Sequence, residues 1–258
     1  MIKKTLLVAA GALAAGIISS QAQVYSQNVV GYANVGTPTS GHEYLITCPF
    51  AIGTSNGVNE VFGSSLPTAT GLFIWNGTGY NTYVYDPTDP DGLGAGAPVW
   101  YLGDDSTPAI PLPTVPVGQG FYLIPAGPLT NTFAGAVAVN VGTSNIMSLP
   151  TPGHEYLVAP VVPYGGAVTN GNNSTGGANL NNLPTATSLL FWTGTSFTTA
   201  LYDPTDPDGL GASAPLWYQG DDSTPYVDPS TGGNVPTISV GQGFFIIPAA
   251  SYQWYTGL

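Results

Sequence analysis

Apolar residues occur along the chain in short runs that Gly, Pro, Asn and Ser separate, and this pattern predicts many β-strands joined by turns. Residues 121–124 and 244–247 are apolar runs bounded by Gly and Pro, as in strands that are buried on both faces. Beyond residue 22 no segment has the 3.6-residue period and the caps of a helix. The sequence therefore predicts an all-β fold of the sandwich or barrel type, without significant helix.

Pairs of apolar runs also predict β-hairpins. Residues 72–75 and 80–85 flank Asn76 and Gly77, a pair that readily adopts the positive φ angles of a type I′ turn. The two further residues after Gly77 leave the length of this loop open. The same pattern returns in the second half of the chain at residues 189–192 and 197–202.

The chain is internally duplicated. Residues 85–108, YDPTDPDGLGAGAPVWYLGDDSTP, return as residues 202–225 with 21 of 24 positions identical. Shorter matches are NVGT at 34–37 and 140–143, GHEYL at 41–45 and 153–157, LPTAT at 66–70 and 183–187, and GQGF at 118–121 and 241–244. The second copy has extra polar stretches around residues 145–152, 165–182 and 228–234, which we expect to form extended surface loops.

The N-terminus has the pattern of a secretory signal peptide. Lys3 and Lys4 precede an apolar run that is shorter than the roughly 20 residues of a spanning helix, and Ser20, Gln21 and Ala22 follow it. We expect a signal peptide at 1–22, a β repeat at 23–134 and a second at 135–258, with no membrane span in the mature chain. Such a protein is secreted or held at the cell surface. Whether the repeats are separate domains or share one core is left open.

The charge balance excludes one class of partner. Lys3 and Lys4 are the only Lys or Arg residues, against 14 acidic side chains, and the formal net charge is −12. Removing residues 1–22 removes both lysines, so that the mature chain carries −12 − 2 = −14. A chain without basic side chains is poorly suited to bind a phosphate backbone, and we expect no nucleic-acid partner.

Ten of the 14 acidic side chains lie in the duplicated segment. Two unit charges 4 Å apart repel by about 4 kcal/mol at an effective dielectric constant of 20, so such a cluster needs counter-ions, protonation or exposure. Calcium takes six to eight oxygen ligands, which an irregular Asp-rich loop can supply, although the spacing is not that of an EF-hand. The alternative is a solvated loop in which Asp, Pro and Gly simply form turns. The predicted Ca²⁺ ligands are Asp86, Asp89, Asp91, Asp104, Asp105, Asp203, Asp206, Asp208, Asp221 and Asp222.

Three motifs carry a family resemblance. They are QVYSQNVVGY at residues 23–32, FIWNG at 73–77 and GQGF at 118–121. With these motifs the chain resembles a group of functionally uncharacterised exported bacterial β-repeat proteins, over nearly all of residues 23–258. The resemblance implies export and a β fold, and it supplies no active site.

Evidence for catalysis is weak. The sequence contains no G-x-S-x-G elbow, HExxH helix or P-loop. His42 beside Glu43 and His154 beside Glu155 are possible acid/base groups or ligands, but neighbouring residues of a strand point to opposite faces. We expect these pairs to have a structural role at a strand edge, and the protein not to be an enzyme.

Aromatic residues support an alternative function. Trp75, Trp192, Trp100 and Trp217, with 15 tyrosines, could form a platform for a polysaccharide, as in a lectin-like carbohydrate-binding module. Aromatic residues at alternating strand positions are also common as core or cross-strand pairs. Exposure of the four indoles in one row distinguishes the two interpretations.

Self-assembly is a further expectation. Residues 28–37 resemble the joining segment at residues 136–143, so the N-terminal strand of one molecule could complete the second repeat of the next. Repeated contacts of this kind build a head-to-tail homo-oligomer, such as a filament or surface layer, whereas pairing within one chain is the alternative.

Cys48, the only cysteine, follows an apolar run and is expected to be a buried hydrophobe, with an intermolecular disulfide as the other possibility. We therefore expect a secreted, calcium-associated structural or adhesive protein.

Overall fold

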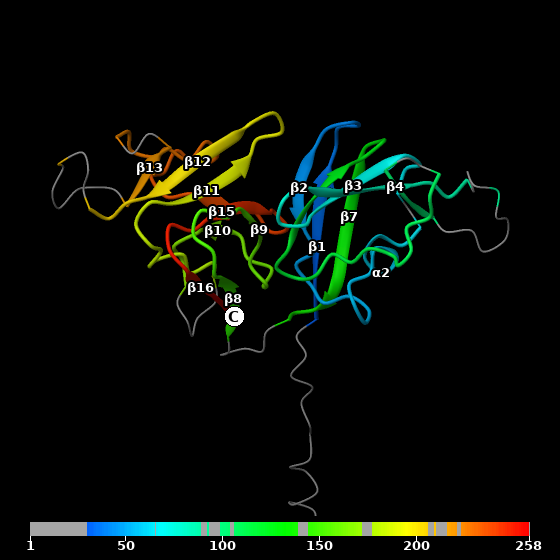
Figure 1. The fold of residues 1–258 in the computed structure, drawn as a ribbon, viewed down its shortest axis with the longest axis horizontal. Coiled ribbons are helices and arrows are strands. Elements are labelled where there is room, and N and C mark those ends of the chain that lie inside the picture. The colour runs from blue at the N-terminus through cyan, green and yellow to red at the C-terminus, as the bar shows by residue number, and fades with distance from the viewer. Residues whose placement is uncertain are drawn as a thin grey trace, which may run out of the picture.

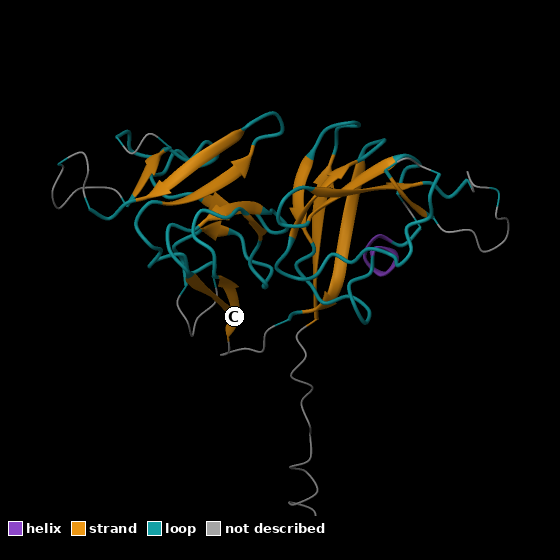
Figure 2. Ribbon diagram, in the orientation of Figure 1, coloured by secondary structure: helices purple, strands orange, loops and turns teal. Residues whose placement is uncertain are grey.

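The computed structural model describes residues 30–64, 66–88, 92, 99–103, 106–138, 144–171, 177–205, 209, 216–220 and 223–257. Strands dominate this part of the chain, which confirms the predicted all-β fold (Figure 2). A five-residue helix, α2 (Val58–Phe62), was not expected from the sequence. Its first turn is held by Glu60, whose carboxylate accepts a hydrogen bond of 2.9 Å from the backbone N–H of Gly57.

Two antiparallel five-stranded sheets have the same strand order and stand side by side (Figure 1). The first sheet is ordered β2 (Tyr44–Thr47), β6 (Gly120–Ile124), β3 (Thr70–Trp75), β4 (Tyr80–Tyr85) and β5 (Trp100–Leu102). The second is ordered β9 (Tyr156–Val158), β15 (Phe244–Ile247), β11 (Thr187–Trp192), β12 (Phe197–Tyr202) and β13 (Trp217–Gln219). Each half of the chain thus builds its own sheet, and the two sheets have the same strand order.

Three two-stranded ribbons complete the described fold. They pair β1 (Val30–Thr37) with β7 (Leu129–Ala136), β8 (Ser144–Leu149) with β16 (Tyr252–Gly257), and β10 (Gly166–Ala167) with β14 (Thr237–Ile238). The N-terminal strand therefore pairs within its own chain, which is the intrachain alternative to strand exchange. The predicted boundary after residue 134 falls inside β7, and the division into repeats by residue number stays a prediction.

The register of these ribbons gives the structural correspondence between the halves. Thr37 lies opposite Leu129 in one ribbon, and Leu149 lies opposite Tyr252 in the other. Thr37 thus corresponds to Leu149, in agreement with the GHEYL match that follows both positions. The NVGT match at residues 140–143 is displaced by six positions from this correspondence, so it does not mark the strand equivalent to β1.

Each half packs around its own hydrophobic cluster. Leu72, Trp100 and Phe121 lie in the first cluster, and Leu189, Trp217 and Phe244 occupy the corresponding places in the second. A third cluster joins the halves, built around Leu45, Tyr122, Leu157 and Phe245. Both predicted central strands are buried on both faces, since β6 and β15 each expose only their last residue in part.

Both predicted hairpins are present, but the turn differs from the expected one. β3 and β4 are joined by four residues, closed by a hydrogen bond of 2.9 Å from the N–H of Asn76 to the carbonyl of Gly79. Gly77 has φ +99°, whereas Asn76 does not have the positive φ that a type I′ turn requires. Instead, the Oδ1 of Asn76 accepts hydrogen bonds from the backbone N–H groups of Thr78 and Gly79, at 3.1 and 3.0 Å.

The longest extra stretch of the second half is not simply a surface loop. Val168, Ala178 and Leu180 are fully buried in the second core, which corrects the expectation for residues 165–182. The reason is that these three side chains are apolar and pack into the second hydrophobic cluster, although Gly and Asn residues surround them in the sequence. Within the described ranges, no helix has the length and apolar character needed to cross a membrane.

Candidate functional site

Two of the ten predicted calcium ligands lie in the described part of the chain. Asp86 and Asp203 are only 8% and 6% exposed and begin the two copies of the acidic segment. In each, Oδ1 accepts hydrogen bonds from the backbone N–H (2.7 Å) and the hydroxyl (2.6 Å) of Thr88 or Thr205. These carboxylates thus initiate a turn. The other eight lie outside the described residues: Asp89, Asp91, Asp104, Asp105, Asp206, Asp208, Asp221 and Asp222.

The bases of both acidic segments are closed by the same backbone contacts. The N–H of Asp86 donates to the carbonyl of Val99, and that of Asp203 to the carbonyl of Leu216, both at 3.0 Å. At the other end of β5, the N–H of Leu102 donates to the carbonyl of Thr107 at 2.7 Å. The backbone on both sides of β5 is therefore fixed by a hydrogen bond, to Asp86 before the strand and within residues 102–107 after it.

The described residues hold no group of three or more His, Cys, Asp or Glu side chains placed to bind one metal ion. In Asp86 and Asp203 one carboxylate oxygen already accepts two hydrogen bonds, so the second oxygen would be the ligand of a cation. A calcium site at these segments stays a prediction.

The predicted indole platform is not exposed. Trp100 and Trp217 are fully buried and pack edge-on against Tyr85 and Tyr202, with ring centroids 5.4 and 5.2 Å apart. Their Nε1 atoms are buried without a hydrogen-bond partner among the described residues. Because both indoles lie inside the two hydrophobic clusters, they are core residues and do not form a row with Trp75 and Trp192.

Trp75 and Trp192 instead join the two halves by reciprocal contacts. The Nε1 of Trp192 donates to the carbonyl of Glu43 at 2.9 Å, and the Nε1 of Trp75 donates to the carbonyl of Glu155 at 3.1 Å. Each indole also meets a ring of the other half at nearly a right angle, with centroids 5.8 Å apart: Trp75 with Phe245, and Trp192 with Tyr122. Equivalent residues thus make equivalent contacts in both directions.

The backbone repeats this reciprocity. The N–H of Thr47 donates to the carbonyl of Gly241, and the N–H of Ala159 donates to the carbonyl of Gly118, both at 2.9 Å. Between these contacts the backbones of the two halves approach closely, since a Cβ on Gly243 would lie 3.3 Å from the Cα of Gly120. Hydrogen bonds and packed rings on both sides of this approach join the halves into one body.

The His-Glu pairs lie at this junction. Glu43 and Glu155 contribute their backbone carbonyls to the Trp contacts, and their side chains are exposed. His42 packs beside Tyr44, with centroids 5.4 Å apart. Burial, and further the charges of Glu155 and Glu43, raise the pKa of Tyr80 to about 12 despite its hydrogen bond with Tyr122. Burial raises the pKa of Tyr122 as well, so both hydroxyls stay protonated at neutral pH.

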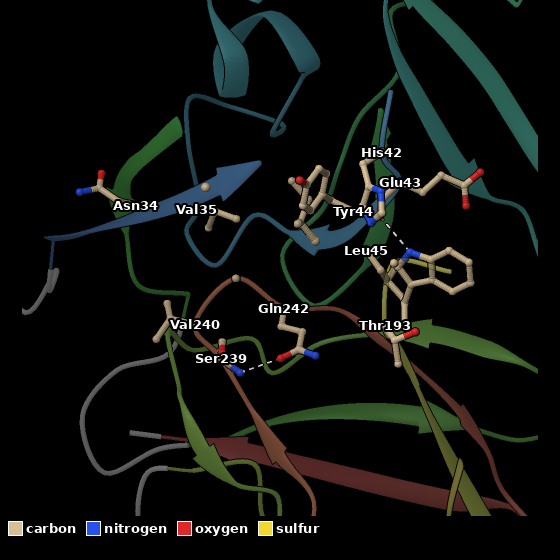
Figure 3. Close-up of a pocket in the computed structure, with 15 residues that line it drawn as sticks. Asn34, Val35, His42, Glu43, Tyr44, Leu45, Thr193, Ser239, Val240 and Gln242 are labelled. Carbon is tan, nitrogen blue, oxygen red and sulfur yellow. Dashed lines mark hydrogen bonds between the residues drawn. The ribbon is translucent and has the colours of Figure 1, made fainter. Parts of the chain in front are cut away.

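A hollow of about 380 Å³ opens on one side of the junction (Figure 3). Its walls come from β1 and β2 of the first half and from the turn before β15 of the second. The side chains around it include His42, Tyr44, Trp192, Thr193, Val240 and Gln242. Sequence reasoning did not identify this site, because residues 34–46 and 239–242, which form its walls, lie about 200 positions apart in the chain. The repeated GQGF motif was the available signal, since Gln242 belongs to it.

A second hollow of about 310 Å³ adjoins the first and is bounded by Asp228. This carboxylate, only 3% exposed, accepts hydrogen bonds from the backbone N–H groups of Ser230, Thr231 and Thr237, at 2.8, 3.0 and 2.7 Å. Burial raises the pKa of Asp228, but these hydrogen bonds and that of the Ser230 hydroxyl outweigh it and lower the pKa to about 2. Asp228 therefore stays ionised and braces the extra loop of the second half.

Comparison with models of known protein families, with curated protein sequences and with solved structures finds no match to this chain. The resemblance to exported bacterial β-repeat proteins therefore stays an expectation from the motifs.

Proposed function

We propose that the protein is a secreted, calcium-associated structural or adhesive protein that uses its two acidic segments as equivalent attachment points. The position of these segments carries the proposal. Asp86 follows β4 and Asp203 follows β12, and these strands extend toward opposite ends of the molecule (Figure 1). A body with the same binding element at both ends can bridge two partners.

The junction between the halves supports a bridging role. Trp75 and Trp192 hold the two sheets together through indole hydrogen bonds and edge-on ring contacts in both directions. A rigid body keeps its two ends at a constant separation, so binding at one end positions the other with little loss of conformational entropy.

The partner that fits best is a second copy of the same chain, with calcium between acidic segments. Beyond Lys4 the sequence has no Lys or Arg, so two such segments would repel one another without a divalent cation. Joined end to end, such bodies form linear assemblies. Assembly by exchange of the N-terminal strand is not part of the proposal, because β1 pairs with β7 and β8 occupies the equivalent place in the second half.

Light scattering and thermal unfolding, each with calcium and with a chelator, test this function. Calcium that binds the native state should raise the melting temperature with concentration, and the particle mass should rise. Asp89→Asn with Asp91→Asn inactivates the first segment, and Asp206→Asn with Asp208→Asn is the matched change in the second. Either pair alone should stop assembly at dimers, and all four together should leave monomers. Equal mass and melting temperature with calcium and with chelator would refute the proposal.

A further inference from the structure

We propose that the two adjoining hollows form one groove that binds a neutral oligosaccharide. The hollows share four lining residues: Trp192, Thr193, Ser239 and Gln242. Their volumes, about 380 and 310 Å³, each lie within the range of roughly 300–1,000 Å³ that small-molecule sites occupy. This site is separate from the acidic segments, and its function does not depend on theirs.

The two hollows open on one side of the junction, and the residues there differ from those at the equivalent positions of the other side. Val35 lines the groove, whereas the structurally equivalent residue of the second half is Met147, which packs against Val161 and Val162. Val240 is 37% exposed in the groove, whereas its equivalent, Val117, is packed into that same apolar cluster. A larger side chain thus fills on one side the space that is open on the other.

The far wall of the groove is built by an insertion. Residues 228–234 are extra in the second copy, and this stretch supplies Asp228, Pro229 and Ser230 to the second hollow. A surface insertion needs no internal fastening to be tolerated, yet Asp228 fastens this one at both carboxylate oxygens. The duplicated fold therefore carries an ordered addition at the place where the groove extends.

The shared centre of the groove is held in place before any ligand arrives. The Oε1 of Gln242 accepts a hydrogen bond of 2.9 Å from the backbone N–H of Ser239, which turns the amide nitrogen away from Ser239 and toward the hollow (Figure 3). Trp192 is oriented by its bond to Glu43 and by Phe197, whose ring centroid lies 4.9 Å away. Groups that are already ordered lose little entropy on binding.

The chemistry of the lining selects the ligand class. Amide and hydroxyl groups from Gln242, Thr193, Ser239 and Ser230 can donate and accept hydrogen bonds, and Trp192 supplies apolar ring surface. The lining contains no Lys or Arg, while Glu43 and Asp228 are acidic, so a phosphorylated, sulfated or carboxylated ligand would be repelled. A neutral sugar presents hydroxyl edges and apolar C–H faces, which match these two kinds of surface.

Isothermal titration calorimetry of the full chain tests the groove with cellohexaose, mannohexaose, xylohexaose, maltohexaose and oligogalacturonate as probes. We expect at least one neutral probe to bind, with and without calcium, and oligogalacturonate not to bind. Val35→Met fills the hollow with the residue of the opposite side, and Gln242→Ala removes a central polar group. Each should weaken binding by roughly tenfold or more, the equivalent of a lost hydrogen bond or contact.

Matched controls come from the other side of the junction. Met147→Val and Gln119→Ala change the equivalent positions away from the groove and should leave the affinity within about twofold. If Val35→Met lowers the melting temperature strongly, the pair Gln242→Ala and Gln119→Ala decides. The inference is overturned if no neutral probe binds, if oligogalacturonate binds equally well, or if Gln242→Ala binds like the unaltered protein. Loss of calcium-dependent assembly alone would leave the groove unaffected.

Discussion

The indole nitrogen of Trp192 and the carbonyl oxygen of Glu43 lie 2.9 Å apart, although 149 positions separate the two residues in the chain. The equivalent contact, from Trp75 to Glu155, spans 80 positions in the opposite direction. Each half therefore inserts the tryptophan at the end of a hairpin strand against the His-Glu segment of the other. These reciprocal contacts hold the two sheets together, and they fix the position of Trp192 in the proposed groove.

The Trp contacts give the first prediction. Trp192→Phe and Trp75→Phe each remove an indole N–H and leave a carbonyl unpaired at the junction. We expect each to lower the free energy of unfolding by about 1–2 kcal/mol, from the lost hydrogen bond and ring area. Urea unfolding followed by circular dichroism measures this. Trp100→Phe removes an indole N–H that has no partner among the described residues, so its loss of stability comes from core packing and not from a hydrogen bond. Unchanged unfolding midpoints in both junction variants would contradict the assigned contacts.

Two hairpin glycines give a matched comparison. Gly194 and Gly77 have φ angles of +101° and +99°, so alanine is strained at both positions to a similar degree. A Cβ on Gly194 would collide with the imidazole of His42, whereas one on Gly77 would lie 3.6 Å from the Nε2 of His154, an ordinary contact. We expect Gly194→Ala to lower the melting temperature further than Gly77→Ala. Equal losses would show that the strain alone matters.

Asp228 gives a pH dependence. Its pKa is lowered from 3.8 to about 2 in the folded protein, so its contribution to stability is complete above pH 4 and is lost as the pH falls toward 2. A shift of this size corresponds to roughly 2 kcal/mol. Asp228→Asn should therefore be less stable than the unaltered protein at pH 6, and the difference should shrink as the pH approaches 2.

Stability measured by urea unfolding between pH 6 and pH 2 checks this. Hydrogen bonds from Thr54 and Gly57 lower the pKa of Glu60 to about 2. Glu60 therefore titrates over the same range in both proteins, and its contribution cancels when their stabilities are subtracted. A difference that is independent of pH would contradict the role of the Asp228 carboxylate.

Cys48 gives a prediction about reactivity. It is fully buried, and its Sγ lies 3.3 Å from the carbonyl of Phe50. Burial raises the pKa of its thiol to about 11, so little thiolate exists at pH 8. We expect iodoacetamide to label the native protein far more slowly than the urea-unfolded chain, as mass spectrometry would show. Rapid labelling of the native protein, or disulfide-linked dimers, would contradict this burial.

Local patterns were sufficient for much of the fold. The strands on both sides of Asn76 and the buried strand after Gly120 follow from alternation, apolar runs and turn residues, which depend on neighbours in the chain. The helix α2 was missed because five residues are too few to show a helical period. The NVGT match aligned β1 with the wrong segment of the second half. The strand register, which pairs β1 with β7 and β8 with β16, gives the correct correspondence.

The candidate sites, like the fold, were predicted from the sequence only in part. Asp86 and Asp203 were identified from composition and repetition, and both lie where a turn begins. Trp100 and Trp217 were candidates for a surface platform, yet they fill the two cores. A sequence pattern indicates that an aromatic residue lies on a strand but not which face of that strand the rest of the fold covers.

By itself, the sequence determined the all-β class, the duplication and the acidic excess, because strand periodicity, repetition and charge are properties of residues in order. Only the tertiary structure decided that the halves meet through Trp75 and Trp192, and that Val35 leaves open the space that Met147 fills. The physical reason is that these contacts join segments far apart in the chain. Which segments meet depends on how both sheets pack at once, and no local pattern encodes that.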